Sequence, residues 1–228
     1  MGAAANASAV RGVLFDLDGT LIDSAPDLAG AANRLRADFG LAPLPLEMLR
    51  PMVGSGARGM VGVAFGVVPG EARFEPLRDT FLAHYEAMLL DQTAPFPGVQ
   101  DMLSALDAAG IRWGIVTNKA ARFTLPIIAG LKLDERAAAV VCGDTTPHSK
   151  PHPEPLLHAA RAMRLAPEDM VYVGDDLRDA QAARAAGMPM AVATWGYLGQ
   201  GEPAHTWGAD ALLDAPDQLL DWLLARGI

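Results

Sequence analysis

The chain has 228 residues, of which 51% are hydrophobic and 20% are charged, a balance typical of a globular protein with a sizeable core. It carries 18 basic and 27 acidic residues, which gives a formal net charge of −9 at pH 7. This charge argues against general binding to nucleic acid or to an anionic membrane, since either partner would require a basic face, so we expect neither.

Other features of the sequence indicate where the protein works. Cys142 is the single cysteine, which rules out an intramolecular disulfide and suits a reducing compartment. The first ten residues have neither a basic start nor a long apolar segment, and no run of 18 apolar residues occurs. We therefore expect a soluble, cytoplasmic protein that acts as a monomer or a small homo-oligomer.

Short apolar runs that end in polar or glycine-containing turns predict the strands in chain order. The first run is GVLFD (12–16), and the later ones are RWGIVTN (112–118), AVVCGD (139–144), MVYVGDD (170–176), MAVAT (190–194) and ADALLD (209–214). Alanine- and leucine-rich segments with helical spacing lie between the later runs. Strands that are apolar throughout and alternate with helices indicate a parallel sheet covered on both faces. We predict a doubly wound α/β domain.

Residues 24–92 break this alternation. They contain no clear strand, only amphipathic stretches such as PDLAGAANRLRADFG and EARFEPLRDTFLAHYEAMLL, before the turn-rich TAPFPGV. We therefore predict a helical cap domain of residues 24–92, inserted into a core of residues 1–23 and 93–228. The two crossings, near Ser24 and Pro95, are the expected hinges.

Polar residues gather where the predicted strands end. The carboxyl ends of parallel strands share one edge of an open α/β sheet, and ligands bind at that edge. A single acidic residue at a strand end is often only a helix cap, but several of them beside a lysine and a Thr-Asn pair indicate a site. These residues are Asp16, Asp18, Thr117, Asn118, Asp144, Asp175 and Asp176, with Lys150 and Asp179 a few positions beyond such ends.

Three or more carboxylates share an edge only when a cation or a proton offsets their repulsion. Ligation by aspartate oxygens, without histidine or cysteine, favours a hard ion, and we expect Mg2+. Mg2+ usually shares its coordination shell with phosphate oxygens, and a lysine and a threonine hydroxyl nearby suit the same phosphate. One aspartate is then available as a nucleophile, and its neighbour as general acid and base.

At this point the residues carry a family resemblance. DLDGTLIDS, VTN, the lysine of HSKPHPEP, and GDDLRD resemble the four motifs of the haloacid dehalogenase-like (HAD) phosphatases, in the family's order and over essentially the whole chain. The helical insert directly after the first motif is similar to the family's helical cap subclass. The resemblance implies a HAD-like Rossmannoid core with an inserted cap, and hydrolysis of a small phosphomonoester.

The resemblance also implies a role for each motif residue. Asp16 is then the nucleophile that forms an aspartyl-phosphate, and Asp18 protonates the leaving alcohol and later deprotonates the hydrolytic water. Lys150 positions Asp16 and neutralises charge on the transferring group. Thr117 and Asn118 hold the phosphoryl oxygens.

The metal site follows from the same resemblance. Mg2+ is expected to be bound by Asp16, by the main-chain carbonyl of Asp18, and by Asp175. The separate roles of Asp176 and Asp179 stay open. Dehalogenases of the superfamily lack the second aspartate of the first motif, so Asp18 favours phosphoryl transfer.

Two features of the sequence allow other interpretations. GSGARG (54–59) matches GxGxxG, but it lies inside the helical insert and not between a strand and a helix, so we interpret it as a cap turn and not as a dinucleotide site. We predict that Arg58 in this turn meets a substrate carboxylate. Arg178, inside GDDLRD, is interpreted as a structural arginine that anchors a loop, with a role in the site as the alternative. A non-catalytic binding protein on this scaffold would have lost Asp16 or Asp18.

Within the family, the chain is most similar to phosphoglycolate phosphatase-like enzymes, and the nearest branch is the N-acetylmuramic acid 6-phosphate phosphatases of cell-wall recycling. The shared segments are SGARGMVGVAFG, VTNKAARFTLPI, SKPHPEPL, VGDDLRDA and WGADALLD. Phosphoglycolate phosphatases more often read GDSxxD in the fourth motif, where this chain has Asp176. The implied substrate is therefore N-acetylmuramic acid 6-phosphate first and 2-phosphoglycolate second, with a sugar phosphomutase as a more distant alternative.

Overall fold

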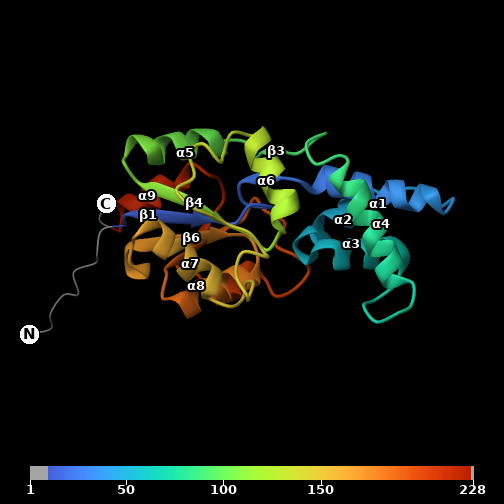
Figure 1. Cartoon of the computed structure of the whole chain (residues 1–228). Helices are drawn as coiled ribbons and strands as arrows, with labels where there is room; N and C mark the ends of the chain where they lie inside the picture. The colour runs from blue at the N-terminus through green and yellow to red at the C-terminus, as the bar shows by residue number, and fades with distance from the viewer. Residues whose placement is uncertain (1–9, 227–228) are drawn as a thin grey trace, which may run out of the picture.

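Six parallel strands form the central sheet of the computed structural model, which describes residues 10–226 (Figure 1). Their order across the sheet is β5-β4-β1-β6-β7-β8, so the first strand of the sequence lies in the middle. Every residue of β1, β6 and β7 is buried, which explains why these runs are apolar throughout. The predicted doubly wound α/β class is confirmed. The strands are β1 (Gly12–Phe15), β4 (Arg112–Val116), β5 (Val140–Val141), β6 (Met170–Gly174), β7 (Met190–Ala193) and β8 (Ala211–Leu213).

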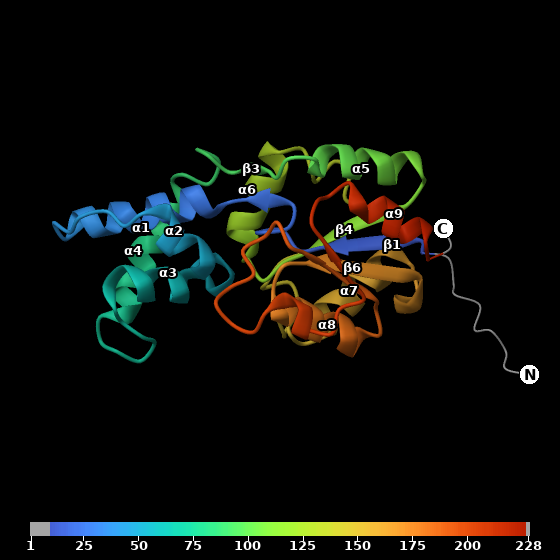
Figure 2. The ribbon, with the colours of Figure 1, turned by 180° about the vertical axis from the view of Figure 1, so that it is seen from behind.

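Helices cover both faces of the sheet. Successive side chains of a strand point to opposite faces, so Val13 and Phe15 join one apolar cluster and Leu14 joins the other. The helices α7 and α8 cover the Leu14 face, whereas α5 and α9 cover the opposite face (Figures 1 and 2). Within residues 10–226, no helix has the length and the apolar character that crossing a membrane requires. The core helices are α5 (Val99–Ala108), α6 (Ala121–Gly130), α7 (Glu154–Met163), α8 (Leu177–Ala186) and α9 (Gln218–Leu224), with the 3-10 turns η2 (Pro167–Asp169) and η3 (Ala204–Thr206).

A separate group of helices lies beyond one end of the sheet (Figures 1 and 2). We call them the cap helices: α1 (Ala25–Asp38), α2 (Leu46–Leu49), η1 (Arg50–Ser55), α3 (Gly56–Phe65) and α4 (Phe74–Glu86). A proline in its first turn suits the start of α1, and Gly66, with a φ of +67°, ends α3 in the left-handed conformation that glycine adopts readily. These helices fall within the segment that the sequence assigns to a cap domain. The domain boundaries stay a prediction, and positions 1–9 and 227–228 of the predicted core lie outside the described residues.

The two chain crossings between the core and the cap helices lie side by side. The strands β2 (Ile22–Asp23) and β3 (Ala94–Pro95) pair in antiparallel fashion there. The buried Asp27 fastens the returning chain, because its carboxylate accepts hydrogen bonds from the backbone N–H groups of Gln92 and Thr93, each at 2.9 Å. Both predicted hinge positions are at this two-stranded ribbon.

Candidate active site

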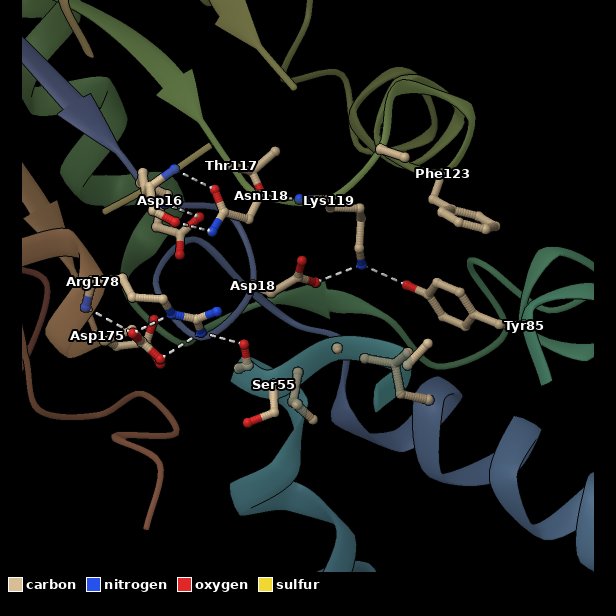
Figure 3. A pocket seen from close by; sticks show the side chains of 18 of the residues that line it. Asp16, Asp18, Ser55, Tyr85, Thr117, Asn118, Lys119, Phe123, Asp175 and Arg178 are labelled. Atoms are coloured by element: carbon tan, nitrogen blue, oxygen red, sulfur yellow. Dashed lines mark hydrogen bonds and ion pairs between the residues drawn. The ribbon is translucent and has the colours of Figure 1, made fainter. Parts of the chain in front are cut away.

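Residues that follow three neighbouring strands meet at the carboxyl edge of the sheet (Figure 3). Because β1 lies between β4 and β6, the residues directly after these strands, Asp16, Thr117 and Asp175, become neighbours. The turn after Asp18 passes very close to Asp175. A Cβ at Gly19 would lie 2.1 Å from a carboxylate oxygen of Asp175, and the φ of Gly19 is +84°, so this turn requires glycine.

A buried lysine neutralises part of this acidic edge. Lys150 Nζ lies 2.9 Å from Asp16 Oδ1 and 2.8 Å from Asp179 Oδ1. It also donates hydrogen bonds to the carbonyl oxygen of Val116 at 2.9 Å and to the hydroxyl of Tyr172 at 2.8 Å. Burial acts to lower the pKa of Lys150, but the two carboxylates outweigh burial and raise it, so the ammonium group stays charged.

Asp16, Asp175 and Asp179 form a compact carboxylate cluster, in which one oxygen from each residue lies within 4.8 Å of the others. Burial raises the pKa of Asp16 to about 7; Lys150 opposes this rise and Asp179 adds to it. Burial and then repulsion from Asp16 raise the pKa of Asp175 well above its usual range. A hard divalent cation would relieve such a cluster, so the donor set fits Mg2+. The carboxylate of Asp18 is not part of the cluster. This agrees with the family resemblance, which implied only the main-chain carbonyl of Asp18 as a metal ligand.

The Asp18 side chain lies toward the cap helices (Figure 3). Its Oδ1 accepts hydrogen bonds from Lys119 Nζ at 2.7 Å and from the hydroxyl of Ser24. Lys119 Nζ also donates to the Tyr85 hydroxyl at 2.6 Å, so a lysine of the core joins Asp18 to α4. Burial raises the pKa of Tyr85 to about 12, so its phenol is neutral. Sequence reasoning missed Lys119, although its place directly after the Thr-Asn pair was an available signal.

The Thr-Asn pair after β4 makes contacts within the core. Thr117 Oγ1 accepts a hydrogen bond from the backbone N–H of Lys119 at 3.1 Å. The Asn118 side chain donates to the backbone carbonyl of Lys150 and accepts from the backbone N–H of Lys150, both at 2.9 Å. Asn118 therefore ties the loop after β4 to the loop that carries Lys150. The predicted contact of both residues with phosphoryl oxygens stays a prediction.

The fourth motif leads into α8 through a capping box. Asp176 Oδ1 accepts from the backbone N–H of Arg178 at 2.9 Å, and Asp179 Oδ2 accepts from the backbone N–H of Asp176 at 3.1 Å. The guanidinium of Arg178 binds both carboxylate oxygens of Asp176 at 2.8 Å and donates to the Gly54 carbonyl of the cap. Burial acts to raise the pKa of Asp176, but the hydrogen bonds from Arg178 outweigh burial and lower it. Asp176 thus holds Arg178, whereas Asp179 holds Lys150.

A cavity of about 290 Å³ lies between this edge and the cap helices. Its core side is polar and contains the carboxylate cluster and Lys150. Its other side is largely apolar, and Ser55 and Gly56 at the start of α3 reach it. The apolar lining residues are Leu28, Val53, Ala57, Phe81, Leu82, Ala120 and Phe123.

Arg58 is not one of the described residues that line this cavity. It is exposed and borders a neighbouring groove together with Ser55, Arg178 and Leu198. Its predicted contact with a substrate carboxylate stays a prediction. Asp144, which the sequence placed with the site residues, does not line the cavity either: it is exposed, and its carboxylate accepts a hydrogen bond from the backbone N–H of Ala121 at 2.9 Å at the start of α6. The remaining predicted site residues line the cavity: Asp16, Asp18, Thr117, Asn118, Lys150, Asp175, Asp176 and Asp179.

Comparison with known proteins identifies the family. The family model described as haloacid dehalogenase-like hydrolase matches residues 13–193, which is most of the chain. The chain belongs to this family. Relatives of this HAD-like hydrolase include a phosphoglycolate phosphatase of Xylella fastidiosa, 48% identical over 92% of this chain and 91% of the relative. An N-acetylmuramic acid 6-phosphate phosphatase of Pseudomonas aeruginosa is 42% identical over 94% of this chain and 95% of the relative.

Solved structures show the same fold. The crystal structure of a predicted phosphoglycolate phosphatase from Haemophilus somnus 129pt superposes with a TM-score of 0.83 at 28% identity, covering 93% of this chain and 97% of that one. The predicted family and the predicted enzyme class, a HAD-superfamily phosphatase, are confirmed.

Proposed function

We propose that this HAD-like phosphatase is a Mg2+-dependent phosphomonoester hydrolase that works through an aspartyl-phosphate on Asp16. The observation that carries the proposal is the Asp16 carboxylate, held 2.9 Å from Lys150 Nζ beside the carboxylate cluster in a cavity. Phosphate-monoester hydrolysis is very slow without a catalyst, so it needs charges fixed in this way. Asp16, Asp175 and the main-chain carbonyl of Asp18 would hold Mg2+, which when bound would supply positive charge that offsets the charge of the phosphoryl oxygens.

The residues of the chain carry out two successive displacements. An Asp16 oxygen attacks phosphorus, the bond from phosphorus to the leaving oxygen breaks, and Asp18 gives that oxygen a proton. A water molecule then attacks the phosphorus of the aspartyl-phosphate, Asp18 takes a proton from this water, and the bond between Asp16 and phosphorus breaks. Inorganic phosphate is released and Asp16 regains its carboxylate. Lys150 keeps Asp16 in place, and Thr117 and Asn118 contact the phosphoryl oxygens.

The cavity favours a substrate larger than a two-carbon acid. Its volume of about 290 Å³ is just below the roughly 300–1,000 Å³ of pockets that take drug-sized ligands, and it exceeds what a two-carbon acid needs. The apolar Leu28, Val53 and Phe81 suit the methyl groups and ring faces of an acetylated sugar acid. A relative named for N-acetylmuramic acid 6-phosphate matches nearly the whole chain. We therefore propose this sugar acid phosphate as the substrate and cell-wall recycling as the context.

The second candidate substrate is 2-phosphoglycolate, because a relative named for it is 48% identical to this chain. Both candidates carry a carboxylate in addition to the phosphate. In either case the proposed enzyme works in the cytoplasm, as a monomer or a small homo-oligomer, on a free small molecule. A buried, single Cys142 is compatible with that compartment.

The two candidates are separated by kinetics. Phosphate release by the purified protein with Mg2+ gives kcat/KM for each acid, and we expect the sugar acid phosphate to be preferred by roughly tenfold or more, or about 1.4 kcal/mol in transition-state binding. A preference of that size for 2-phosphoglycolate would reverse the assignment. A sugar phosphomutase would return the phosphoryl group to the sugar and release little phosphate.

A further inference from the structure

Three basic residues are among the described residues that line the cavity: Lys119, Lys150 and Arg178. A carboxylate-bearing phosphomonoester brings a second negative group, which needs a cation with hydrogen-bond donors to spare. Lys150 Nζ already contacts four oxygen acceptors, two of them carboxylates. Lys119 is 9% exposed and is held between Asp18 and Tyr85. Neither lysine is well placed for a further anion.

Arg178 has the donors that the lysines lack. Its Nε and Nη2 bind Asp176, and Nη2 also donates to the Gly54 carbonyl, but Nη1 makes no hydrogen bond within residues 10–226. The side chain is 35% exposed. Figure 3 shows its guanidinium pointing into the space between Asp18 and Ser55. An arginine therefore presents a free edge to the cavity.

The guanidinium is also fixed in direction before any ligand arrives. Asp176 accepts two hydrogen bonds of 2.8 Å from it, and Asp176 is itself held in place as the N-cap of α8. The contact with Gly54 places the guanidinium where the core meets the cap, beside the start of α3. A group bound to Nη1 would lie where the core meets the cap helices, within reach of residues of both. Preorganisation of this kind reduces the entropy lost on binding.

We propose that Arg178, rather than Arg58, binds the carboxylate of the substrate through Nη1 and so determines the preference for acidic phosphomonoesters. Arg58 and Arg178 both border the neighbouring groove, but of the two only Arg178 also lines the cavity that contains Asp16. The inference rests on the proposed carboxylate-bearing substrate. It changes the interpretation of Arg178 from a loop anchor to a specificity residue.

The test compares two substrates that differ only in the carboxylate-bearing group. N-Acetylglucosamine 6-phosphate is N-acetylmuramic acid 6-phosphate without the lactyl ether. Arg178→Gln should lower kcat/KM for the muramic acid phosphate by roughly 10- to 100-fold, as expected for loss of a charged hydrogen bond, and for the glucosamine phosphate by no more than about threefold. Arg178→Lys keeps the charge but loses the two-pronged hydrogen bonding of the guanidinium. Its kcat/KM for the muramic acid phosphate should therefore lie between the values of Arg178→Gln and wild type.

Arg58→Gln is the matched control variant, since it removes a neighbouring guanidinium that does not line the cavity. Equal losses of Arg178→Gln on both sugars would overturn the proposal, because they would show that Arg178 only supports the fold or the phosphate site. A selective loss in Arg58→Gln and none in Arg178→Gln would assign the carboxylate to Arg58 instead. If Arg178→Gln does not fold, as judged by circular dichroism, Arg178→Lys decides the question through the ratio of kcat/KM for the muramic acid phosphate to kcat/KM for the glucosamine phosphate.

The wild-type enzyme keeps this test separate from the test of the proposed function. The proposed substrate class predicts that the wild type has a higher kcat/KM for the muramic acid phosphate than for the glucosamine phosphate, or a higher kcat/KM for 2-phosphoglycolate than for ethyl phosphate. A wild type that shows neither preference would overturn this class. A wild-type preference that survives in Arg178→Gln would overturn only the assignment of Arg178.

Discussion

Asp16 is the residue on which the proposed chemistry depends. Its side chain is 14% exposed, and its carboxylate contacts Lys150 Nζ at 2.9 Å and lines the cavity. Asparagine keeps the shape of this side chain but removes the attacking charge, so Asp16→Asn should lower kcat by at least about 10³-fold while the chain stays folded. Phosphate release measures the first effect and circular dichroism the second. Near-normal turnover by Asp16→Asn would contradict the assignment of the nucleophile.

The same residue predicts a pH dependence of stability in the metal-free protein. Burial raises the pKa of Asp16 from 3.8 to about 7, so between these values the folded state holds a proton that the unfolded state has released. A folded state that binds more protons loses stability as the pH rises through this window. Because Asn does not ionise, the free energy of unfolding of Asp16→Asn relative to wild type should increase from pH 5 to pH 8 in EDTA.

Urea unfolding at the two pH values measures this change. Addition of Mg2+ should reduce the change with pH in the stability difference between Asp16→Asn and wild type, because a bound divalent cation favours the ionised carboxylates and stabilises the folded state. An unfolding difference that is the same at both pH values would mean that Asp16 ionises as an ordinary carboxylate in the folded protein.

At the scale of the elements, α4 meets the core through Tyr85. The Tyr85 ring lies 5.5 Å from the ring of Phe123 in α6, and its hydroxyl accepts a hydrogen bond from Lys119. Tyr85→Phe keeps the ring and removes this acceptor from a lysine that also holds Asp18. We expect a loss of about 1–3 kcal/mol in the free energy of unfolding, together with a lower kcat/KM.

A double-mutant cycle with Lys119→Met isolates this contact. In the Lys119→Met protein, Tyr85→Phe should have almost no further effect on either quantity, because the partner of the hydroxyl is already gone. If Tyr85→Phe costs the same in both backgrounds, the hydroxyl does not act through Lys119.

The elements of the core could be predicted from the sequence because parallel strands leave a clear signal. The run GVLF is apolar throughout, and Asp16 follows it directly, so the position of the carboxylate at the sheet edge was available from the pattern. The contacts between the core and the cap helices could not be predicted in this way. Lys119 and Tyr85 are 34 residues apart, and Arg178 and Gly54 are 124 residues apart. Docking of one group of helices on another leaves no periodic pattern in the sequence.

The arginines illustrate the same limit. Both Arg58 and Arg178 stand beside motif residues, and the sequence alone favoured the one in the glycine-rich turn of the insert. The direction in which α3 starts puts Ser55 and Gly56 on the cavity and leaves Arg58 outside it. The N-cap of α8 turns Arg178 toward the cavity. These directions depend on local backbone geometry that spacing does not encode.

At the scale of the whole molecule, the acidic chain surrounds a site that has to accept an anion. The net charge is −9, so attraction must come from the local cations Lys119, Lys150 and Arg178, to which the proposed Mg2+ would add its charge. The cap helices cover this site and are joined to the core by the β2–β3 ribbon. We propose that this ribbon acts as the hinge on which the cap helices open to admit the substrate and close to exclude water from the reaction.

The most direct test of this account is to trap the phosphoryl group on the enzyme. The wild-type protein is mixed with Mg2+ and N-acetylmuramic acid 6-phosphate, quenched with acid within the first turnover, and mapped by mass spectrometry. We predict one added phosphoryl group on the peptide that contains Asp16, which disappears when the substrate is consumed and never forms in Asp16→Asn. A phosphoryl group on any other residue, or full turnover by Asp16→Asn, would contradict the account.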